Sequence, residues 1–436
     1  MKKYIFRLIL NTVTPVSIGN DEADKLSPLC DFIIRNNTVH YLDNNKIARM
    51  VQEKHLINDY VRGAASIDNT QTSFVLERFL RERAGVDPLK YVKESHDFRG
   101  PGRGKIIIRT LYRSGESPVI TGSTIKGCIK TSLLYYWLMN SDEGREKLND
   151  LIKTTESYYE KNKGLIKDVE SVEHEIDVLS GQIRKYSKKD HAIKAATRAK
   201  IESRRRVLET AKDNLAAGRK GLEEKIDKVI DELFYIDDFK NLRVTDSEKF
   251  SRNVIVVCEI KRLHLIKGTL NIPQYVEAIK ENSHSEFEVT IIPGFRQKEF
   301  SFMNNGDLKK LFEILNYFSD ASVNTDWDML DDNYKNFEKD EKSREIYNGL
   351  FDSYEKLNTD ISKVRENNSA FIRLGFGKTF FDNSIGLAIY RTDKEALMKY
   401  VKLMQLGKPM QKIFPVTRSV CTSNFLPMGW VDVALK

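Results

Sequence analysis

The sequence predicts an α+β protein in which a long helical hairpin separates two regions of mixed strands and helices. At the N-terminus, apolar residues alternate with others in YIFRLIL (4–10), the period-two pattern of a half-buried strand. In the middle, apolar residues recur with heptad spacing between positions 165 and 229. Strand-like and helix-like segments return beyond the heptads. The 436 residues suffice for roughly two to three domains and a sizeable core.

Two mixed units are therefore expected, one over residues 1–142 and one over 235–436. In the first, the opening strand runs into TPVSIGND (14–21), a proline and glycine turn signal. Residues 31–43 then have the pattern of a β-hairpin, and 46–83 are rich in helix formers. This order of strands and helices predicts a layered α+β unit.

A basic, glycine-rich segment closes the first unit. From Arg99 to Lys130 there are seven Lys or Arg residues and one acid. Within it, ITGSTIKGCIK (120–130) predicts a strand that turns directly into a helix. Such a helix start presents backbone N–H groups, hydroxyls and a helix dipole to an anion, so we expect a phosphate-binding site there. Ordinary N-capping by Ser123 or Thr124 is the structural alternative, and it is compatible with phosphate contact.

The region from 143 to 234 is predicted to be an inserted antiparallel coiled-coil hairpin. Its apolar seam consists of Leu165, Val169, Val172, Ile176, Leu179, Ile183 and Tyr186 in the first arm and Ile201, Leu208, Leu215, Leu222 and Val229 in the second. A helical insertion lying within a globular domain is the alternative. Two charged faces favour a projecting arm, because charged faces need solvent.

The net charge of +8 comes from this hairpin. Residues 184–220 hold thirteen Lys or Arg and four Asp or Glu, a local charge of +9, so the rest of the chain sums to −1. A basic segment of this kind is either a solvated helical face or a surface for an anionic partner.

A second glycine-rich motif, RLGFGKTFF, lies near the C-terminus. It places Gly375 and Gly377 on either side of Phe376, with Arg373 and Lys378 beyond them. The glycines permit close approach to a ribose-phosphate chain, and the aromatic ring could stack on a base. A turn between core strands with a buried phenylalanine is the structural alternative.

Several chemistries are not indicated by the sequence. The four cysteines form no Cys-x-x-Cys pair and the seven histidines lack metal-ligand spacing, so we expect no disulfide framework, no metal and no cofactor. Gly122 and Gly127 have the separation of a P-loop, but Cys128 stands at the lysine position, which argues against nucleotide hydrolysis. No stretch approaches the roughly 20 apolar residues of a membrane helix, so we expect a cytoplasmic protein.

Taken together, these motifs resemble the RAMP superfamily of CRISPR proteins. The superfamily's order of motifs is matched by TPVSIGND, PVITGSTIKGCIKTSLLYYW, RLGFGKTFF and PVTRSVCTSNFLPMGW. The terminal PMGW and the chain length are most similar to the fifth-subunit family of type III-A (Csm) effector complexes. Thr121 replaces a family proline, Thr379 stands in place of a third glycine, and the hairpin has no counterpart in the motif set.

The resemblance implies two ferredoxin-like (RRM-like) units that grip RNA by its backbone through glycine-rich loops. It implies a non-catalytic subunit that binds the 3′ part of the guide RNA (crRNA), meets target RNA indirectly and contacts adjacent Csm backbone and small subunits. It also implies support of guide maturation by host ribonucleases. The residues assigned to RNA contact are Gly19, Asn20, Arg103, Gly122, Ser123, Thr124, Lys126, Gly127, Lys130, Arg373, Gly375, Phe376, Gly377, Lys378 and Arg418.

Two other functions stay open at this point. A RAMP-type endoribonuclease would cut precursor guide RNA without a metal, using His40 or His96 as a general base. A general RNA-binding protein outside CRISPR would also fit. For the basic hairpin, the sequence leaves three roles open, namely extending the RNA path, contacting a neighbouring subunit and recruiting a nuclease.

Overall fold

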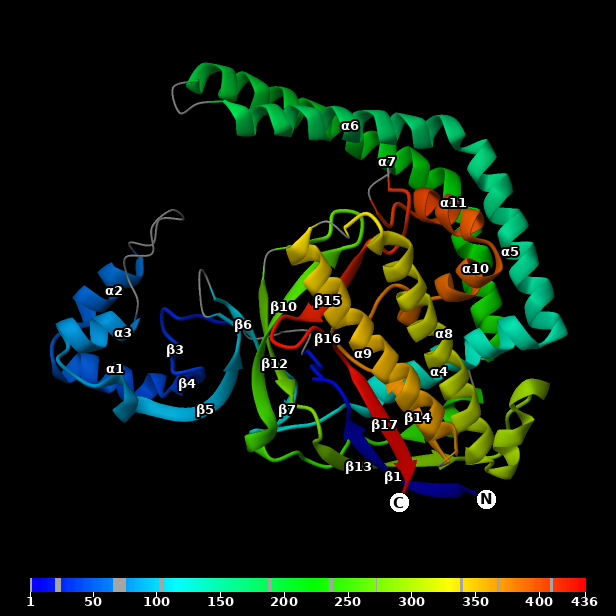
Figure 1. The fold of residues 1–436 in the computed structure, drawn as a ribbon, viewed down its shortest axis with the longest axis horizontal. Coiled ribbons are helices and arrows are strands. Elements are labelled where there is room, and N and C mark those ends of the chain that lie inside the picture. The colour runs from blue at the N-terminus through cyan, green and yellow to red at the C-terminus, as the bar shows by residue number, and fades with distance from the viewer. Residues whose placement is uncertain are drawn as a thin grey trace.

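The computed structural model describes residues 2–19, 25–65, 76–101, 106–186, 190–234, 238–271, 273–337, 340–366, 368–407 and 411–436. Figure 1 shows a body built on two sheets, a small N-terminal module beside it, and a pair of helices that extends beyond the body. This architecture confirms the mixed α and β class. None of the helices in the described part of the chain is both long enough and apolar enough to cross a membrane.

The first sheet is antiparallel, and its central strand is the N-terminal one. The strand order is β14 (Ser369–Arg373), β17 (Trp430–Leu435), β1 (Tyr4–Thr12), β13 (His284–Ile291) and β9 (Leu242–Val244). Leu8 and Leu10 of β1 are buried while Ile5 is 48% exposed, as the alternating sequence pattern predicts. The expected strand at 4–10 is thus confirmed.

The second sheet joins the N-terminal module to the body. Its order is β2 (Lys25–Leu26), β6 (Ile108–Arg109), β12 (Gln274–Ile279), β10 (Ile255–His264), β5 (Val92–Arg99), β4 (Thr38–Leu42) and β3 (Phe32–Arg35), and the strands β11 (Thr269–Leu270), β15 (Thr417–Cys421) and β16 (Leu426–Pro427) extend it from β10. A two-stranded ribbon, β7 (Arg113–Ser114) and β8 (Ser117–Pro118), stands apart. The hairpin expected at 31–43 is β3 and β4, whose turn uses Asn36 and Asn37 at positive φ.

The two large sheets cross the predicted division of the chain into one mixed unit at 1–142 and another at 235–436. Strand β1 from the N-terminal segment pairs with β13 and β17, and β5 and β6 pair with β10 and β12. Each of the two large sheets therefore combines strands from 1–142 with strands from 235–436, so neither large sheet is built from one segment alone. Local strand patterns do not encode pairing partners hundreds of residues away, and for this reason the sequence pointed to contiguous units.

Helices cover the first sheet and fill the module. In the body these are α4 (Gly122–Asn140), α8 (Leu308–Tyr334), α9 (Glu341–Glu366), α10 (Gly386–Thr392) and α11 (Lys394–Met404), and in the module they are α1 (Asn44–Glu53), α2 (Ile57–Ala65) and α3 (Leu76–Arg78). The module has a small core of its own, in which Ile33 from β3 meets Met50 from α1 and Leu80 just after α3. The body shares one large core between α4, α8 and the first sheet.

Between α4 and β9 the chain forms α5 (Asp142–Lys161), α6 (Lys163–Lys185) and α7 (His191–Phe234). Helix α5 packs against α4 and α11, while α6 packs along α7 and runs away from the body (Figure 1). The seam positions Ile201, Leu215 and Leu222 of α7 are at most 7% exposed. The heptad pattern thus marks the face along which the helices pack.

Shortening one seam residue tests this packing. Leu215→Ala is expected to lower the free energy of unfolding by about 2 to 4 kcal/mol, because the 1% exposed side chain leaves a cavity between α6, α7 and α11. Val207→Ala, at 43% exposure on the same helix, is the matched control and should cost less than about 0.5 kcal/mol. Urea denaturation followed by circular dichroism measures both, and equal losses would contradict the assigned seam.

Candidate nucleic-acid interface

The glycine-rich motif RLGFGKTFF forms a loop that interlocks with two other loops. The Phe376 N–H donates to the Ser17 carbonyl at 2.7 Å, and the Leu374 N–H donates to the Gly429 carbonyl at 2.7 Å. The Gly429 N–H in turn donates to the Pro15 carbonyl at 2.9 Å. We call residues 15–19, 374–378 and 428–429 the loop cluster. Its backbone groups fix one another, so its exposed part is held in one shape.

Glycine is required at two positions of the loop cluster. Gly375 has φ +67° and Gly377 has φ +96°, conformations that residues with a side chain rarely adopt. A Cβ atom on Gly375 would collide with the Ser17 carbonyl oxygen, and one on Gly377 would lie 2.9 Å from the Cβ atom of Met428. The glycine pair therefore lets three backbone segments approach closely.

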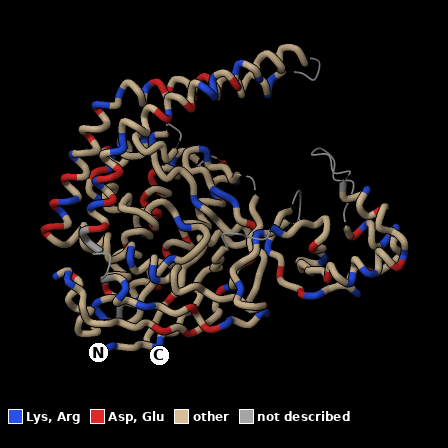
Figure 2. The backbone as a smooth tube through the Cα atoms, turned by 180° about the vertical axis from the view of Figure 1, so that it is seen from behind, with Lys and Arg blue, Asp and Glu red and all other residues tan. Residues whose placement is uncertain are grey.

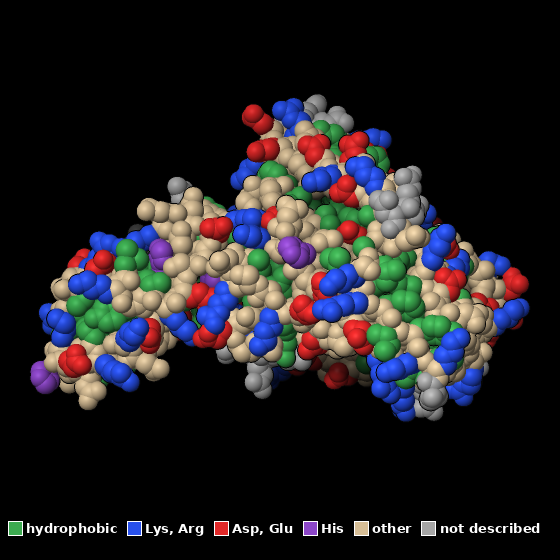
Figure 3. All heavy atoms as spheres, turned by 90° about the horizontal axis from the view of Figure 1, so that it is seen from below, with side chains coloured by type: hydrophobic (Ala, Val, Ile, Leu, Met, Phe, Trp, Pro, Cys, Tyr) green, Lys and Arg blue, Asp and Glu red, His purple; other side chains and the backbone are tan. Residues whose placement is uncertain are grey.

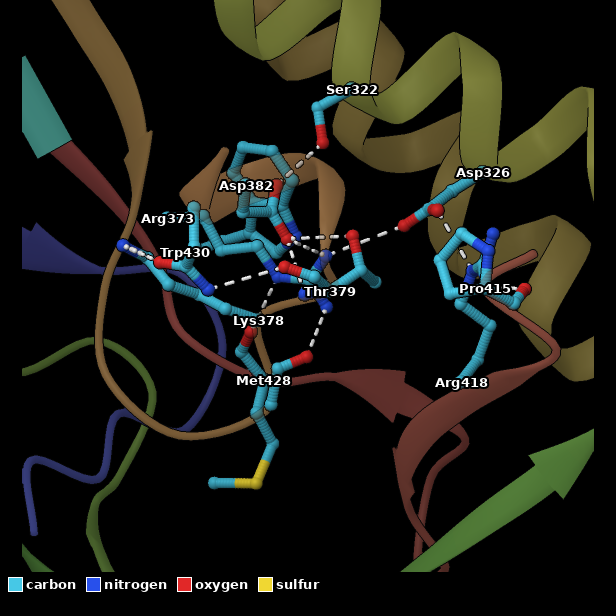
Figure 4. A network of polar contacts seen from close by, with 12 residues as sticks. Ser322, Asp326, Arg373, Lys378, Thr379, Asp382, Pro415, Arg418, Met428 and Trp430 are labelled. Atoms are coloured by element: carbon cyan, nitrogen blue, oxygen red, sulfur yellow. Dashed lines mark hydrogen bonds and ion pairs between the residues drawn. The ribbon is translucent and has the colours of Figure 1, made fainter. Parts of the chain in front are cut away.

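Arg373 holds the loop cluster from inside the protein (Figure 4). Its side chain is 3% exposed, and its guanidinium lies 3.0 Å from Asp382 and 3.3 Å from Asp326. It also donates to the carbonyls of Met428 and Gly377 at 3.1 and 3.0 Å. One side chain thus ties two segments of the loop cluster to two buried carboxylates.

Arg418 completes the same network from the neighbouring strand β15. Its Nε lies 2.8 Å from Asp326 Oδ1, and its Nη1 donates to the Pro415 carbonyl at 2.9 Å. At 1% exposure it has no surface to offer a ligand. The expectation that Arg373 and Arg418 contact RNA directly is corrected here, because both guanidinium groups are buried and engaged by protein oxygens.

The buried network is charged rather than neutral. Burial works to raise the pKa of Asp382, but the Arg373 guanidinium and the bonds from the Thr379 N–H and the Ser322 hydroxyl hold that pKa below its usual value. Burial likewise works to lower the pKa of Arg373, and Asp382 reverses this so that its pKa lies above the ordinary value. Arg373 and Asp382 therefore stabilise each other in their ionised forms.

The start of α4 differs from the phosphate site expected there. The Gly122 N–H donates to Asp246 Oδ1 at 2.8 Å, so a protein carboxylate already occupies this position at the positive end of the helix. The helix begins after Thr121, and neither Ser123 nor Thr124 caps it. Lys126 donates to the Phe239 carbonyl at 2.7 Å. The predicted phosphate contact through Gly122 is wrong because Asp246 takes its N–H group.

The remaining predicted residues differ in how accessible they are. Asn20 and Arg103 lie outside the described residues. On α4, Ser123, Gly127 and Lys130 are exposed, whereas Thr124 and Lys126 are half-buried. In the loop cluster, Gly19 is exposed, and Gly375, Phe376, Gly377 and Lys378 are half-buried. The loop cluster is thus the part of the predicted surface that the structure brings together.

Two side chains of the loop cluster define what it could contact. Phe376 packs on one side against a buried cluster of the second sheet that includes Met428. Lys378 Nζ donates to Asn383 Oδ1 at 3.2 Å, and this hydrogen bond lies at the protein surface. The cluster therefore offers a partly open ring, backbone groups and one cation, a combination that suits a ribose-phosphate chain better than base-specific readout.

The residues that sequence reasoning missed are three acids, of which Asp326 and Asp382 are buried and Asp246 is exposed. Asp326 comes from α8, Asp382 from the turn after the glycine-rich loop, and Asp246 from the segment after β9. Each is bonded to a residue of a predicted RNA-binding motif, Arg373 or Gly122, but none belongs to a motif itself. Among the described residues, no group of three or more His, Cys, Asp or Glu side chains is arranged to hold a metal.

The two candidate histidines lie on strands β4 and β5, away from the loop cluster in the sheet order. His40 Nδ1 is 2.8 Å from the Ser95 hydroxyl, and burial lowers the pKa of His40. His96 is buried, with Nε2 2.8 Å from Glu94 Oε1.

Opposite charges are interspersed over the face seen in Figure 3, so that face has no single basic patch.

The comparisons with known proteins agree with this geometry. The sequence pattern of the RAMP superfamily matches residues 9–381, most of the chain, and the chain belongs to that superfamily. It is similar to a protein of Methanocaldococcus jannaschii described as "CRISPR system Cms protein Csm5", with 21% identity over 451 residues that cover 97% of this chain and 87% of the relative. The resemblance found in the sequence is thereby confirmed.

Two solved structures share the fold over nearly the whole chain. One is a chain of the cryo-EM structure of a Csm-crRNA-target RNA ternary complex of a type III-A CRISPR-Cas system, with TM-score 0.61 and 19% identity, covering 99% of this chain and 100% of that one. The other is the crystal structure of T. onnurineus Csm5, with TM-score 0.53 and 17% identity, covering 97% and 99%. At these identities the likeness concerns the fold.

Proposed function

We propose that this protein is a non-catalytic subunit of a type III-A CRISPR effector complex and that its loop cluster binds the backbone of the guide RNA. The observation that carries the proposal is the full-length similarity to Csm5, together with a glycine-rich loop held rigidly at the surface by Arg373. Rigid backbone groups and a single lysine suit a ligand that presents repeating phosphates.

The proposal extends to the position of the subunit. It lies at the 3′ end of the guide, contacts the adjacent Csm backbone and small subunits, and meets target RNA only through them. Host ribonucleases that trim the guide act beside it in the cytoplasm. Sequencing the RNA that copurifies with the protein from its native cell tests this directly. Repeat-derived 3′ ends support the proposal, and bulk cellular RNA defeats it.

A charge reversal at the loop cluster tests the site itself. Lys378→Glu is expected to weaken binding of a guide-length RNA by about tenfold at low salt and to reduce the salt dependence by about one phosphate contact, because this cation lies on the glycine-rich loop. Fluorescence anisotropy of labelled RNA at several salt concentrations measures both quantities. Lys342→Glu, an exposed position at the start of α9, makes the same charge change elsewhere. Equal weakening by the two variants would refute the assignment of the site.

The endoribonuclease alternative has its own test. Precursor guide RNA is incubated with the purified protein in EDTA. Cleavage that His40→Ala abolishes would replace the non-catalytic role with a catalytic one.

A further inference from the structure

The free end of the α6 and α7 pair is much more basic than the end near the body. The described residues 180–186 and 190–206 hold eight Lys or Arg and two acids, a net +6, whereas 207–234 hold five bases and seven acids, a net −2. Figure 1 shows that the free end extends away from the body toward the side on which the N-terminal module lies. The positive charge of the chain is therefore concentrated where the helices have solvent around them.

Near the body, the basic side chains of α7 are engaged by the protein. Lys212 Nζ lies 2.6 Å from Glu173, and Lys225 Nζ lies 2.5 Å from Asp150. Arg219 is bonded to Glu223 at 2.8 Å and to the Leu403 carbonyl at 2.9 Å. These cations hold the helices to one another and to α11, so they stabilise the fold and are already paired with protein oxygens.

Among the described cations of the free end, most form no ion pair with an acid. Arg204 pairs with Glu175 and Arg205 with Glu202. By contrast, the exposed side chains of Arg184, Lys185, Arg198, Lys200 and Arg206 form no ion pair within the described part of the chain. Figure 2 shows basic positions along both helices of the pair. The free end of the α6 and α7 pair thus has an exposed surface with positive charges that no acidic side chain of the described residues neutralises.

We propose that this free end binds the phosphate backbone of single-stranded RNA, as a second contact apart from the loop cluster. The exposed apolar residues Val178, Ile193 and Val207 lie on two helices, and the free end holds one Phe, Trp or Tyr residue, the half-buried Tyr186. A protein interface of useful affinity needs a buried aromatic or aliphatic anchor, whereas phosphate contact needs only accessible Arg and Lys. The inference rests on the proposed function, because it supposes that RNA is the ligand of this protein.

A triple charge reversal at the free end tests the proposal in the full-length protein. The variant Arg198→Glu, Lys200→Glu, Arg206→Glu is compared with Lys335→Glu, Lys342→Glu, Lys356→Glu, whose exposed positions on and beside α8 and α9 receive the same change of charge. The probe is a fluorescent unstructured polyuridine RNA, titrated between 50 and 200 mM salt. The free-end variant is expected to bind at least about tenfold more weakly at low salt, with the slope of log Kd against log salt reduced by about 2.

The possible outcomes separate this proposal from the proposed function. Equal weakening by both triple variants would mean that overall charge, not the free end, governs binding, and would overturn the inference. Unchanged RNA affinity together with loss of a copurifying protein subunit would also overturn it. If Lys378→Glu weakens RNA binding and the free-end variant does not, the proposed function stands and this inference falls. If only the free-end variant weakens binding, the inference stands and the loop cluster is not the RNA site.

Discussion

Replacing Arg373 with methionine is expected to lower the free energy of unfolding of the body by about 3 to 5 kcal/mol. The substitution fills similar volume but leaves Asp326 and Asp382, each 1% exposed, without the guanidinium that lies 3.3 and 3.0 Å away. Asp326 keeps the Arg418 guanidinium, but Asp382 is left without a paired guanidinium and keeps only hydrogen bonds such as those from Ser322 and Thr379. A buried carboxylate without its cation is costly, and the loss is a large part of the stability of an ordinary domain. Guanidinium chloride denaturation, followed by tryptophan fluorescence, measures the effect.

Two further variants make the Arg373 experiment decisive. Arg373→Lys keeps the charge but cannot reach two carboxylates and the Met428 and Gly377 carbonyls at once, so an intermediate loss is expected. Adding Asp382→Asn to Arg373→Met removes one stranded charge and should recover about 1 kcal/mol or more. A loss below about 1 kcal/mol for Arg373→Met would show that the network does not stabilise the body.

Gly375→Ala is expected to disrupt both the loop cluster and RNA binding. The added methyl group combines the cost of a left-handed conformation with a collision against the Ser17 carbonyl, which together cost about 2 to 5 kcal/mol or force the loop to move. A displaced loop no longer presents its backbone to RNA, so we expect guide RNA affinity to fall by more than about tenfold.

Gly19→Ala is the matched control for Gly375→Ala. It changes a glycine of the same loop cluster, but a Cβ atom there meets nothing within 4 Å and the residue does not have a positive φ. Its stability should therefore change by less than about 0.5 kcal/mol. Thermal unfolding and RNA anisotropy on both variants give the comparison. Equal RNA affinity for Gly375→Ala and the unmodified protein would remove the loop cluster from the proposed interface.

Sequence reasoning succeeded where periodicity or motif order carries the information. The alternation in 4–10 and the heptads of α7 mark buried faces directly, because apolar spacing is a local consequence of which side faces the core. The motif order likewise led to the RAMP superfamily. Marking RLGFGKTFF as a special loop was also possible, because paired glycines imply unusual backbone geometry.

Other features could not be read from the sequence, because they depend on partners far along the chain. Asp246 reaches Gly122 across 124 positions, and Asp326 reaches Arg373 across 47. An arginine beside a glycine-rich loop has the same local pattern whether it points outward to a phosphate or inward to a carboxylate. The motif identified the correct loop. Only the fold shows which of its residues are buried and support the loop from inside the protein.

The pairing of the first strand with the last has a consequence for synthesis. Leu8 in β1 lies opposite Leu435 in β17, and Thr12 opposite Val431, so the central strand of the first sheet receives one neighbour from the six-residue strand β17. At about 5 to 20 residues per second, β1 waits roughly 20 to 85 s on the ribosome before that neighbour exists. Until then its edge is open to pairing with other chains. A nascent chain stalled or cut before β17 should therefore be a target for chaperones and proteases, so a stable first sheet requires that β17 has been synthesised.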